Sequence, residues 1–182
     1  MPYITDHKKK FDDLREYLEN QDRIRRAANG GNSILFSYPP KEEYLYLEKA
    51  KELYQDKATF IDISQLLVEY IEQDGWDEFS QYYRDFISTP HVIFKSDDPS
   101  RDLFDMIIEA IEKASQTDKI PFLIRTGCLA GTGIENVNII EDKTVMELSR
   151  PLVIFYPSTI KDEKLYFLNY RPASKYRCIL VK

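Results

Sequence analysis

Short apolar runs alternate with amphipathic stretches along most of this chain. The apolar runs predict strands at residues 34–37, 59–63, 91–94, 121–124, 151–155, 165–168 and 176–181. Apolar residues that recur every three or four positions predict helices at 5–28, 41–54, 64–71, 76–86 and 99–114. Strands that alternate with helices favour an α/β three-layer sandwich with a mainly parallel sheet, P-loop-NTPase-like or Rossmann-like in topology.

Several boundaries follow from individual residues. The N-terminal helix, 5–28, is expected to pack on the sheet and to end at an Asn-Gly-Gly-Asn stop. Ser64 and Asp98 are predicted helix caps, with Pro99 at a first helical position. The last two strands are expected to form a hairpin or an edge pair. Residues 136–140 are β-branched and Asn-rich, which disfavours a helix there.

The apolar spacing also predicts which side of each helix faces the core. The residues expected to face inward are Phe11, Leu14, Leu18 and Ile24 in the first helix, Tyr44, Leu47 and Tyr54 in the second, and Leu103, Ile107, Ile108, Ile111 and Ala114 in the last.

The strand-turn-helix at 33–43 is the junction where many α/β proteins hold a phosphate. A phosphate-binding turn needs glycines and usually a Lys followed by Ser or Thr. Here the turn is Tyr38-Pro39-Pro40, and the two prolines remove two N–H donors. Glu42 and Glu43 add negative charge that repels a phosphate. The pattern predicts a nucleotide-binding architecture that lacks a phosphate-binding loop.

Composition predicts one soluble domain, 1–182. Hydrophobic residues make up 43% of the 182 residues and charged residues 31%, without an apolar run of membrane-spanning length or a secretory signal. Two cysteines, Cys128 and Cys178, fit a reducing cytoplasm and are expected to be buried free thiols. Neither cysteine forms a ligand pair, and with only His7 and His91 beside them the chain offers little for a metal held by nitrogen or sulfur.

The net charge of −6 argues against a generic nucleic-acid coat, although residues 161–182 have a local balance of +4. In that segment Arg171, Lys175, Tyr176 and Arg177 interleave cations with aromatic rings. Such a pattern suits stacking on bases, an edge strand protected by charge, or a protein contact. A nucleic-acid-binding module therefore stays open as an alternative, with protein binding preferred.

A second alternative is a nucleotide-binding regulator or enzyme with an atypical site near Arg125–Asn136. Gly127, Gly131 and Gly133 follow a strand there, yet they match neither the dinucleotide fingerprint nor the P-loop. A tight turn in a partner-facing loop is the preferred interpretation. Asp62, Asp97 and Asp98 stand where metal-holding carboxylates of nucleotide hydrolases often lie, but the Lys-Ser/Thr partner that such a role needs is missing. Capping of the next helix suffices to explain Asp97 and Asp98.

Four segments together resemble the small B component (BrxB) of bacteriophage-exclusion, or BREX, defence systems. They are residues 34–43, 60–67, the strand ending at Arg125 with its Gly-containing turn, and 151–157 followed by 165–168 and 176–177. The loop 129–133 departs from the family pattern, so the chain would be a divergent member.

The resemblance implies a cytoplasmic accessory protein with no cofactor and no assigned catalytic residues. Its implied partners are a PglZ-like phosphatase-fold protein and, further, the methyltransferase or large ATPase of the system. The residues that match the family-like motifs are expected to be structural or partner-binding, and they are Tyr38, Pro39, Arg125, Tyr156, Pro157, Tyr176 and Arg177.

Overall fold

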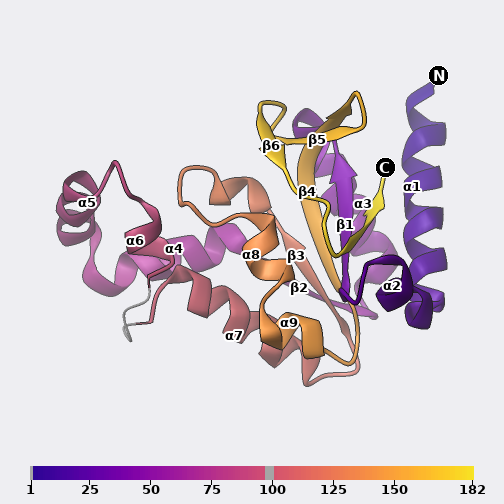
Figure 1. Ribbon diagram of the computed structural model, residues 1–182, viewed down its shortest axis with the longest axis horizontal. Coiled ribbons are helices and arrows are strands. Elements are labelled where there is room, and N and C mark those ends of the chain that lie inside the picture. Colours follow the sequence, from indigo (N-terminus) through magenta and orange to yellow (C-terminus); the bar gives the residue numbers. More distant parts are fainter. Residues whose placement is uncertain (1, 97–100) are drawn as a thin grey trace.

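A central sheet with helices on both sides forms the molecule (Figure 1). The computed structural model describes residues 2–96 and 101–182, with side chains from residue 7 onward. The strands are β1 (Ser33–Tyr38), β2 (Ala58–Asp62), β3 (Ile120–Ile124), β4 (Leu152–Lys161), β5 (Lys164–Phe167), β6 (Arg171–Ala173) and β7 (Cys178–Val181). The three-layer α/β sandwich predicted from the sequence is confirmed.

Five of the described strands are parallel, in the order β2-β3-β4-β1-β7. The Rossmann-like alternative is wrong, because that order places the second strand beside the first. Here β1 lies between β4 and β7, and β2 is at the far edge. The P-loop-like alternative, with the first two strands separated, is the one that this order fits.

The C-terminal strands do not pair with each other as predicted. Strand β4 continues past the parallel sheet, and its second half pairs antiparallel with β5, which pairs with β6. Strand β7 instead joins the sheet edge parallel to β1, with Ser33 opposite Cys178. Its apolar residues Ile179 and Val181 are buried by this position.

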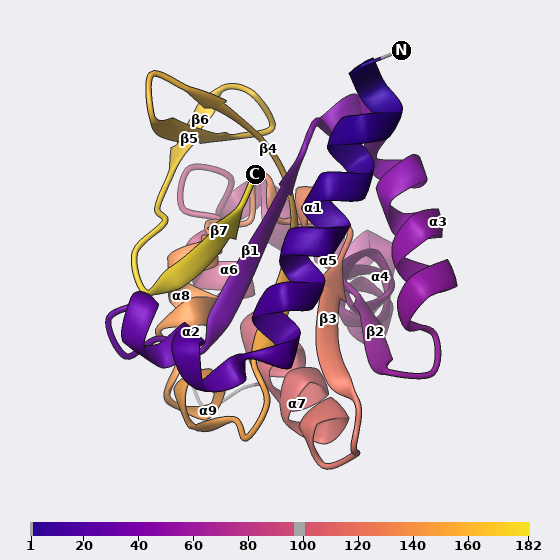
Figure 2. The same ribbon diagram turned by 90° about the vertical axis from the view of Figure 1, so that its right-hand side faces the viewer.

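One face of the sheet is covered by the N-terminal helices and by the helix after β1 (Figure 2). These elements are α1 (Pro2–Glu19), α2 (Gln21–Ala27), a 3-10 turn η1 (Pro40–Glu42) and α3 (Glu43–Tyr54). The single helix predicted at 5–28 is wrong: it breaks at Asn20, which leaves helical geometry and donates its side-chain amide to the Glu16 carbonyl at 2.9 Å. The four residues predicted to face the core are all buried.

Helix α3 shows a register that differs from the predicted one. Tyr44 is 64% exposed, whereas Tyr46 is buried with Leu47 and Tyr54. The reason is the preceding 3-10 turn, which delays the α-helix to Glu43 and rotates its core face.

The other face carries the remaining helices (Figure 1). They are α4 (Ile63–Asp74), α5 (Trp76–Asp85), α6 (His91–Phe94), α7 (Leu103–Ser115), a 3-10 turn η2 (Thr126–Leu129), α8 (Asn136–Ile140) and α9 (Lys143–Glu147). Helices α5 and α6 lie farthest from the sheet and form a lobe with α4. In α7 the predicted inward residues are buried, apart from the half-buried Ile108.

Two short segments form helices against expectation. Residues 91–94, predicted as a strand, form α6 after Pro90, and Ile93 and Phe94 pack inside the lobe. A four-residue apolar run cannot distinguish a strand from a buried helical turn. Residues 136–140 form α8 because a capping box, in which Glu135 and Asn138 bond reciprocally, offsets their poor propensity.

The starts of α4 and α7 also differ from the caps predicted for them. The cap of α4 is Asp62, whose Oδ1 accepts from the Ser64 N–H at 3.0 Å, so Ser64 is a donor to the cap. Helix α7 begins at Leu103 with the capping box Asp102–Asp105. Asp97, Asp98 and Pro99 lie outside the described residues.

Among the helices that the structure describes, not one combines the length and the apolar character that a bilayer-crossing segment requires.

Candidate functional site

The junction between β1 and α3 is built around a buried tyrosine. Tyr38 ends β1 with no exposed surface, and its ring stacks on Tyr46 with 5.3 Å between centroids. Its hydroxyl donates to Oε2 of Glu43 at 2.7 Å. Burial raises the pKa of Tyr38 well above its ordinary value, and the hydrogen bond to Glu43 raises it further. The junction thus holds a neutral phenol against the first carboxylate of α3.

Prolines and carboxylates occupy the rest of this turn. Pro39 is extended and Pro40 opens the 3-10 turn η1, so neither offers an N–H to a ligand. Oε2 of Glu42 lies 2.9 Å from Nε2 of His7 on α1. A phosphate site needs hydrogen-bond donors at this turn. Here two acidic side chains, Glu42 and Glu43, occupy that position instead.

Lys10 places a cation beneath the same junction. Its side chain is buried, and its Nζ donates to the Ser37 carbonyl at 3.2 Å and lies 5.5 Å from the Tyr46 ring centroid. Ser37 also shares a hydrogen bond of 2.9 Å with Ser158 on β4. These contacts tie α1, β1 and β4 together, so the lysine is committed to the protein's own backbone.

Arg125 lies at the carboxyl end of β3 in a left-handed conformation, with φ of 55°. Its Nη1 donates to Oδ2 of Asp62, at the end of β2, at 2.7 Å. The other oxygen of Asp62 caps α4. The two oxygens of this carboxylate are therefore both used within the protein, one as a helix cap and one as an ion-pair partner.

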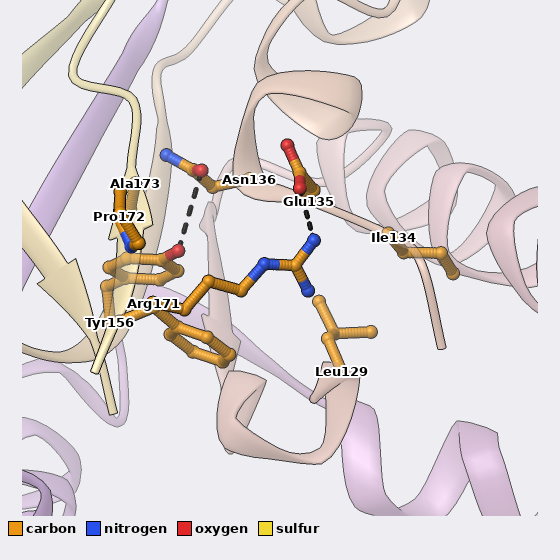
Figure 3. A pocket seen from close by; sticks show the side chains of 9 residues that line it. Leu129, Ile134, Glu135, Asn136, Tyr156, Arg171, Pro172 and Ala173 are labelled. Carbon is orange, nitrogen blue, oxygen red and sulfur yellow. Dashed lines mark hydrogen bonds and ion pairs between the residues drawn. The ribbon is translucent and has the colours of Figure 1, made fainter. Parts of the chain in front are cut away.

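Tyr156 and Pro157 follow on β4, where Pro157 lies opposite Tyr38 in the sheet register. The Tyr156 hydroxyl points at the Asn136 amide oxygen, 3.5 Å away (Figure 3). Beside it Arg171 forms an ion pair with Glu135. These side chains line a cavity of about 20 Å³, which is room for one water molecule.

The structure divides the predicted C-terminal segment between two edges of the sheet. Arg171 lies with Tyr156 near the carboxyl edge, and Lys175 donates to the Glu163 carbonyl at 3.2 Å. Arg177 precedes β7, at the amino edge, where its Nη1 is 3.8 Å from Oε1 of Glu141. Its guanidinium also lies over the Tyr176 ring, 5.3 Å from the centroid. The cations thus have intramolecular partners and do not form one continuous patch.

Five of the predicted residues do meet at one edge. Tyr38, Pro39, Arg125, Tyr156 and Pro157 gather at the carboxyl edge because they end neighbouring parallel strands. Sequence reasoning missed the partners that hold them. Glu135 and Asn136 come from the capping box and first residue of α8, and Glu43 follows the 3-10 turn η1. Lys10 arrives from α1, for which the sequence offered no pairing signal.

The thiols are not prepared for nucleophilic attack. Cys128 is half-buried in η2 and Cys178 is buried in β7, and both are free. Burial raises the pKa of the Cys128 thiol, and that of Cys178 to about 12. Neutral thiols are poor nucleophiles. Within the described residues, no group of three or more His, Cys, Asp or Glu side chains could hold a metal ion.

Stability is expected to fall in alkaline solution. Burial raises the pKa of Tyr54 and of Tyr70 to about 12 from 10.0. The folded state thus favours the protonated phenol, and its stabilising contribution is complete below pH 10 and lost as pH rises through about 12. Urea unfolding at pH 8 and pH 11 should differ by about 1 kcal/mol per tyrosine. The difference should shrink in Tyr54→Phe; equal stability at both pH values would contradict this.

Neither a protein-family model, nor a curated protein, nor a solved structure matches this chain.

Proposed function

We propose that this chain is an accessory, assembly subunit of a BREX-like bacterial antiphage defence system, and that it acts without catalysing a reaction. The observation that carries the proposal is the filled β1–α3 junction. Tyr38 and Glu43 bond to each other there, and Pro39 and Pro40 remove N–H donors. An α/β protein that has a strand edge of this kind and no phosphate-binding turn is suited to binding proteins.

Exposed apolar side chains support the same role. Trp76 is 67% exposed and Ile87 63% on the helical lobe, and Tyr170 is 66% exposed near the β5–β6 hairpin. Large exposed aromatic residues are enriched at protein interfaces. The proposed partners are a PglZ-like protein and, further, the methyltransferase or large ATPase of the system, with the cytoplasm as the location.

The two alternatives have weaker support. The cavity next to residues 125–136 measures about 20 Å³, whereas small-molecule pockets measure about 300–1,000 Å³. For nucleic acid, Arg171 and Arg177 are paired with carboxylates, and the chain has a net charge of −6. Binding to nucleic acid would have to break those pairs and overcome the overall charge.

Affinity purification tests the proposal. A tagged copy of the chain is expressed together with the PglZ-like protein, and the expected result is a complex that survives size-exclusion chromatography. A thermal shift with a nucleotide panel runs beside it, and no change in melting temperature is expected. Nucleotide turnover without any co-purifying defence protein would overturn the proposal.

A further inference from the structure

Helices α1 and α3 lie side by side on the face of the sheet away from the lobe (Figure 2). Side chains from both helices line a groove. Its volume is about 670 Å³. The floor includes Phe11 and Tyr54, which are both buried. The wall from α3 presents Leu45, 38% exposed, and Leu53, 43% exposed. Leucines left this exposed on the wall of a groove mark a surface that another molecule can cover.

The rim of the groove is cationic in an acidic protein. Lys8, Arg15, Lys49 and Lys57 line it, with Asp12 as the only carboxylate among the lining residues. The chain as a whole has a net charge of −6. A basic apolar groove on an acidic protein favours a ligand that is both apolar and anionic.

The cations of the rim are available to a ligand. No described side chain forms an ion pair with Lys8 or Lys57. Arg15 pairs with Asp12 at 2.7 Å and Lys49 with Glu52 at 2.8 Å, three residues away on the same helix in each case. Exposed pairs of this kind contribute about 0–1 kcal/mol, so exchange for a carboxylate on a ligand has a small penalty.

Tyr54 adds a donor to the floor. Its side chain is 7% exposed, and its hydroxyl has no hydrogen-bond partner among the described residues. The hydroxyl oxygen itself is not fully buried, so it is open to an acceptor on a ligand in the groove. A carboxylate that enters the groove between Arg15 and Tyr54 would supply one.

The spacing of these groups fits a helix. Leu45, Lys49 and Leu53 are four residues apart, so they form one stripe about 12 Å long on α3. On α1, Lys8 and Arg15 are seven residues apart, about 10 Å along the axis, with Phe11 between them. A lipid or fatty acid would use cations clustered at one end, but here they are distributed along both walls.

We propose that the α1–α3 groove binds an acidic amphipathic helix of a partner protein. The apolar residues of that helix lie between Leu45, Leu53 and Phe11, and its carboxylates pair with the cations of the rim. This is the helix-in-groove mode of recognition, with apolar anchors every three or four residues. The inference rests on the proposed assembly role and identifies the surface through which that role is carried out.

A pair of synthetic peptides provides the test. The probe is a stapled helix of about 16 residues, with leucines every three or four positions and glutamates beside them. Its twin has lysine in place of each glutamate. Fluorescence anisotropy should show binding of the Glu peptide at least tenfold tighter than that of the Lys peptide.

Matched variants locate the binding surface. K8E/K49E should weaken binding of the Glu peptide at least tenfold. K9E/K51E makes the same change of charge on the same two helices, at exposed positions outside the groove, and should stay within twofold of the wild type. A second variant, Leu53→Glu, should also lose binding, whereas Tyr44→Glu on the exposed side of α3 should not. Thermal unfolding establishes that each variant is folded.

Other outcomes overturn the proposal. These are equal affinity for the two peptides, an equal loss of affinity in K8E/K49E and K9E/K51E, or preferred binding to phosphatidylglycerol vesicles. Self-association that K8E/K49E abolishes, without any peptide binding, would also overturn it.

Co-purification distinguishes failure of the groove proposal from failure of the proposed assembly role. If the PglZ-like protein co-purifies equally with wild type and K8E/K49E, the groove proposal fails and the assembly role stands. If it co-purifies with neither, the assembly role fails.

Discussion

Replacing Tyr38 by alanine is expected to lower the free energy of unfolding by about 4 kcal/mol. The ring has no exposed surface and contacts Tyr46 and Phe155, with 5.3 and 6.4 Å between centroids. Truncation would leave a cavity between β1 and α3 that this aromatic cluster cannot fill. For a domain of this size the melting temperature should fall by roughly 8–16 °C.

Two further variants separate the ring from the hydroxyl. Tyr38→Phe keeps the packing and removes the bond to Glu43, so it should lose only about 1 kcal/mol. Tyr44→Ala removes a tyrosine that is 64% exposed and should stay within about 0.5 kcal/mol of the wild type. Urea denaturation measures all three. A Tyr38→Ala variant as mild as Tyr44→Ala would mean that the ring of Tyr38 is not buried between β1 and α3.

The second large effect is expected at the start of β1. A Cβ added to Gly31 would lie 1.9 Å from the carbonyl oxygen of Arg177, a backbone atom that cannot rotate away. Gly31→Ala should therefore force β1 and β7 apart and destabilise the protein by about 3 kcal/mol. The effect should appear as a lower urea midpoint with little change in slope.

Gly127 provides the matched control. A Cβ there would lie 3.6 Å from Cγ of Pro157, an ordinary contact, and its φ is not in the left-handed region. Gly127→Ala should be neutral or slightly stabilising, because alanine restricts the unfolded chain. A Gly31→Ala variant as stable as Gly127→Ala would mean that β7 does not lie beside β1 as described.

The parts of the fold that sequence predicts well are those with a strong local signal. β3 and β4 are apolar runs, and α7 has 13 residues of regular amphipathic spacing. Such segments are buried because of their own composition. Their alternation with helices was enough to predict a layered α/β sandwich. The parallel addition of β7 to β1 was not predictable, because the two strands are more than a hundred residues apart in the chain.

The predicted secondary structure was wrong where helix caps and tertiary contacts outweigh the intrinsic propensity of the residues. Residues 136–140 form a helix through the Glu135–Asn138 capping box, and residues 91–94 form one inside the lobe. The core face of α3 was predicted at Tyr44 in place of Tyr46, since the 3-10 turn that rotates it has no clear sequence signal.

The candidate site was partly predictable for a different reason. Tyr38, Pro39, Arg125 and Tyr156 were singled out because they match motifs of the BREX-family resemblance, and the sequence did not predict that they meet at one sheet edge. The side chains that form hydrogen bonds or ion pairs with these residues come from elsewhere in the chain, and the sequence did not identify them as partners. The α1–α3 groove was not predicted at all, because the distance between two helices depends on the packing of both against the sheet.

The function proposed for this fold is to bind a partner protein without depending on a nucleotide. Calorimetric titration of the purified chain with the PglZ-like protein, with and without MgATP in both solutions, tests it most directly. Saturable binding with the same affinity in both conditions is expected. An absence of binding, or binding only when MgATP is present, would contradict it.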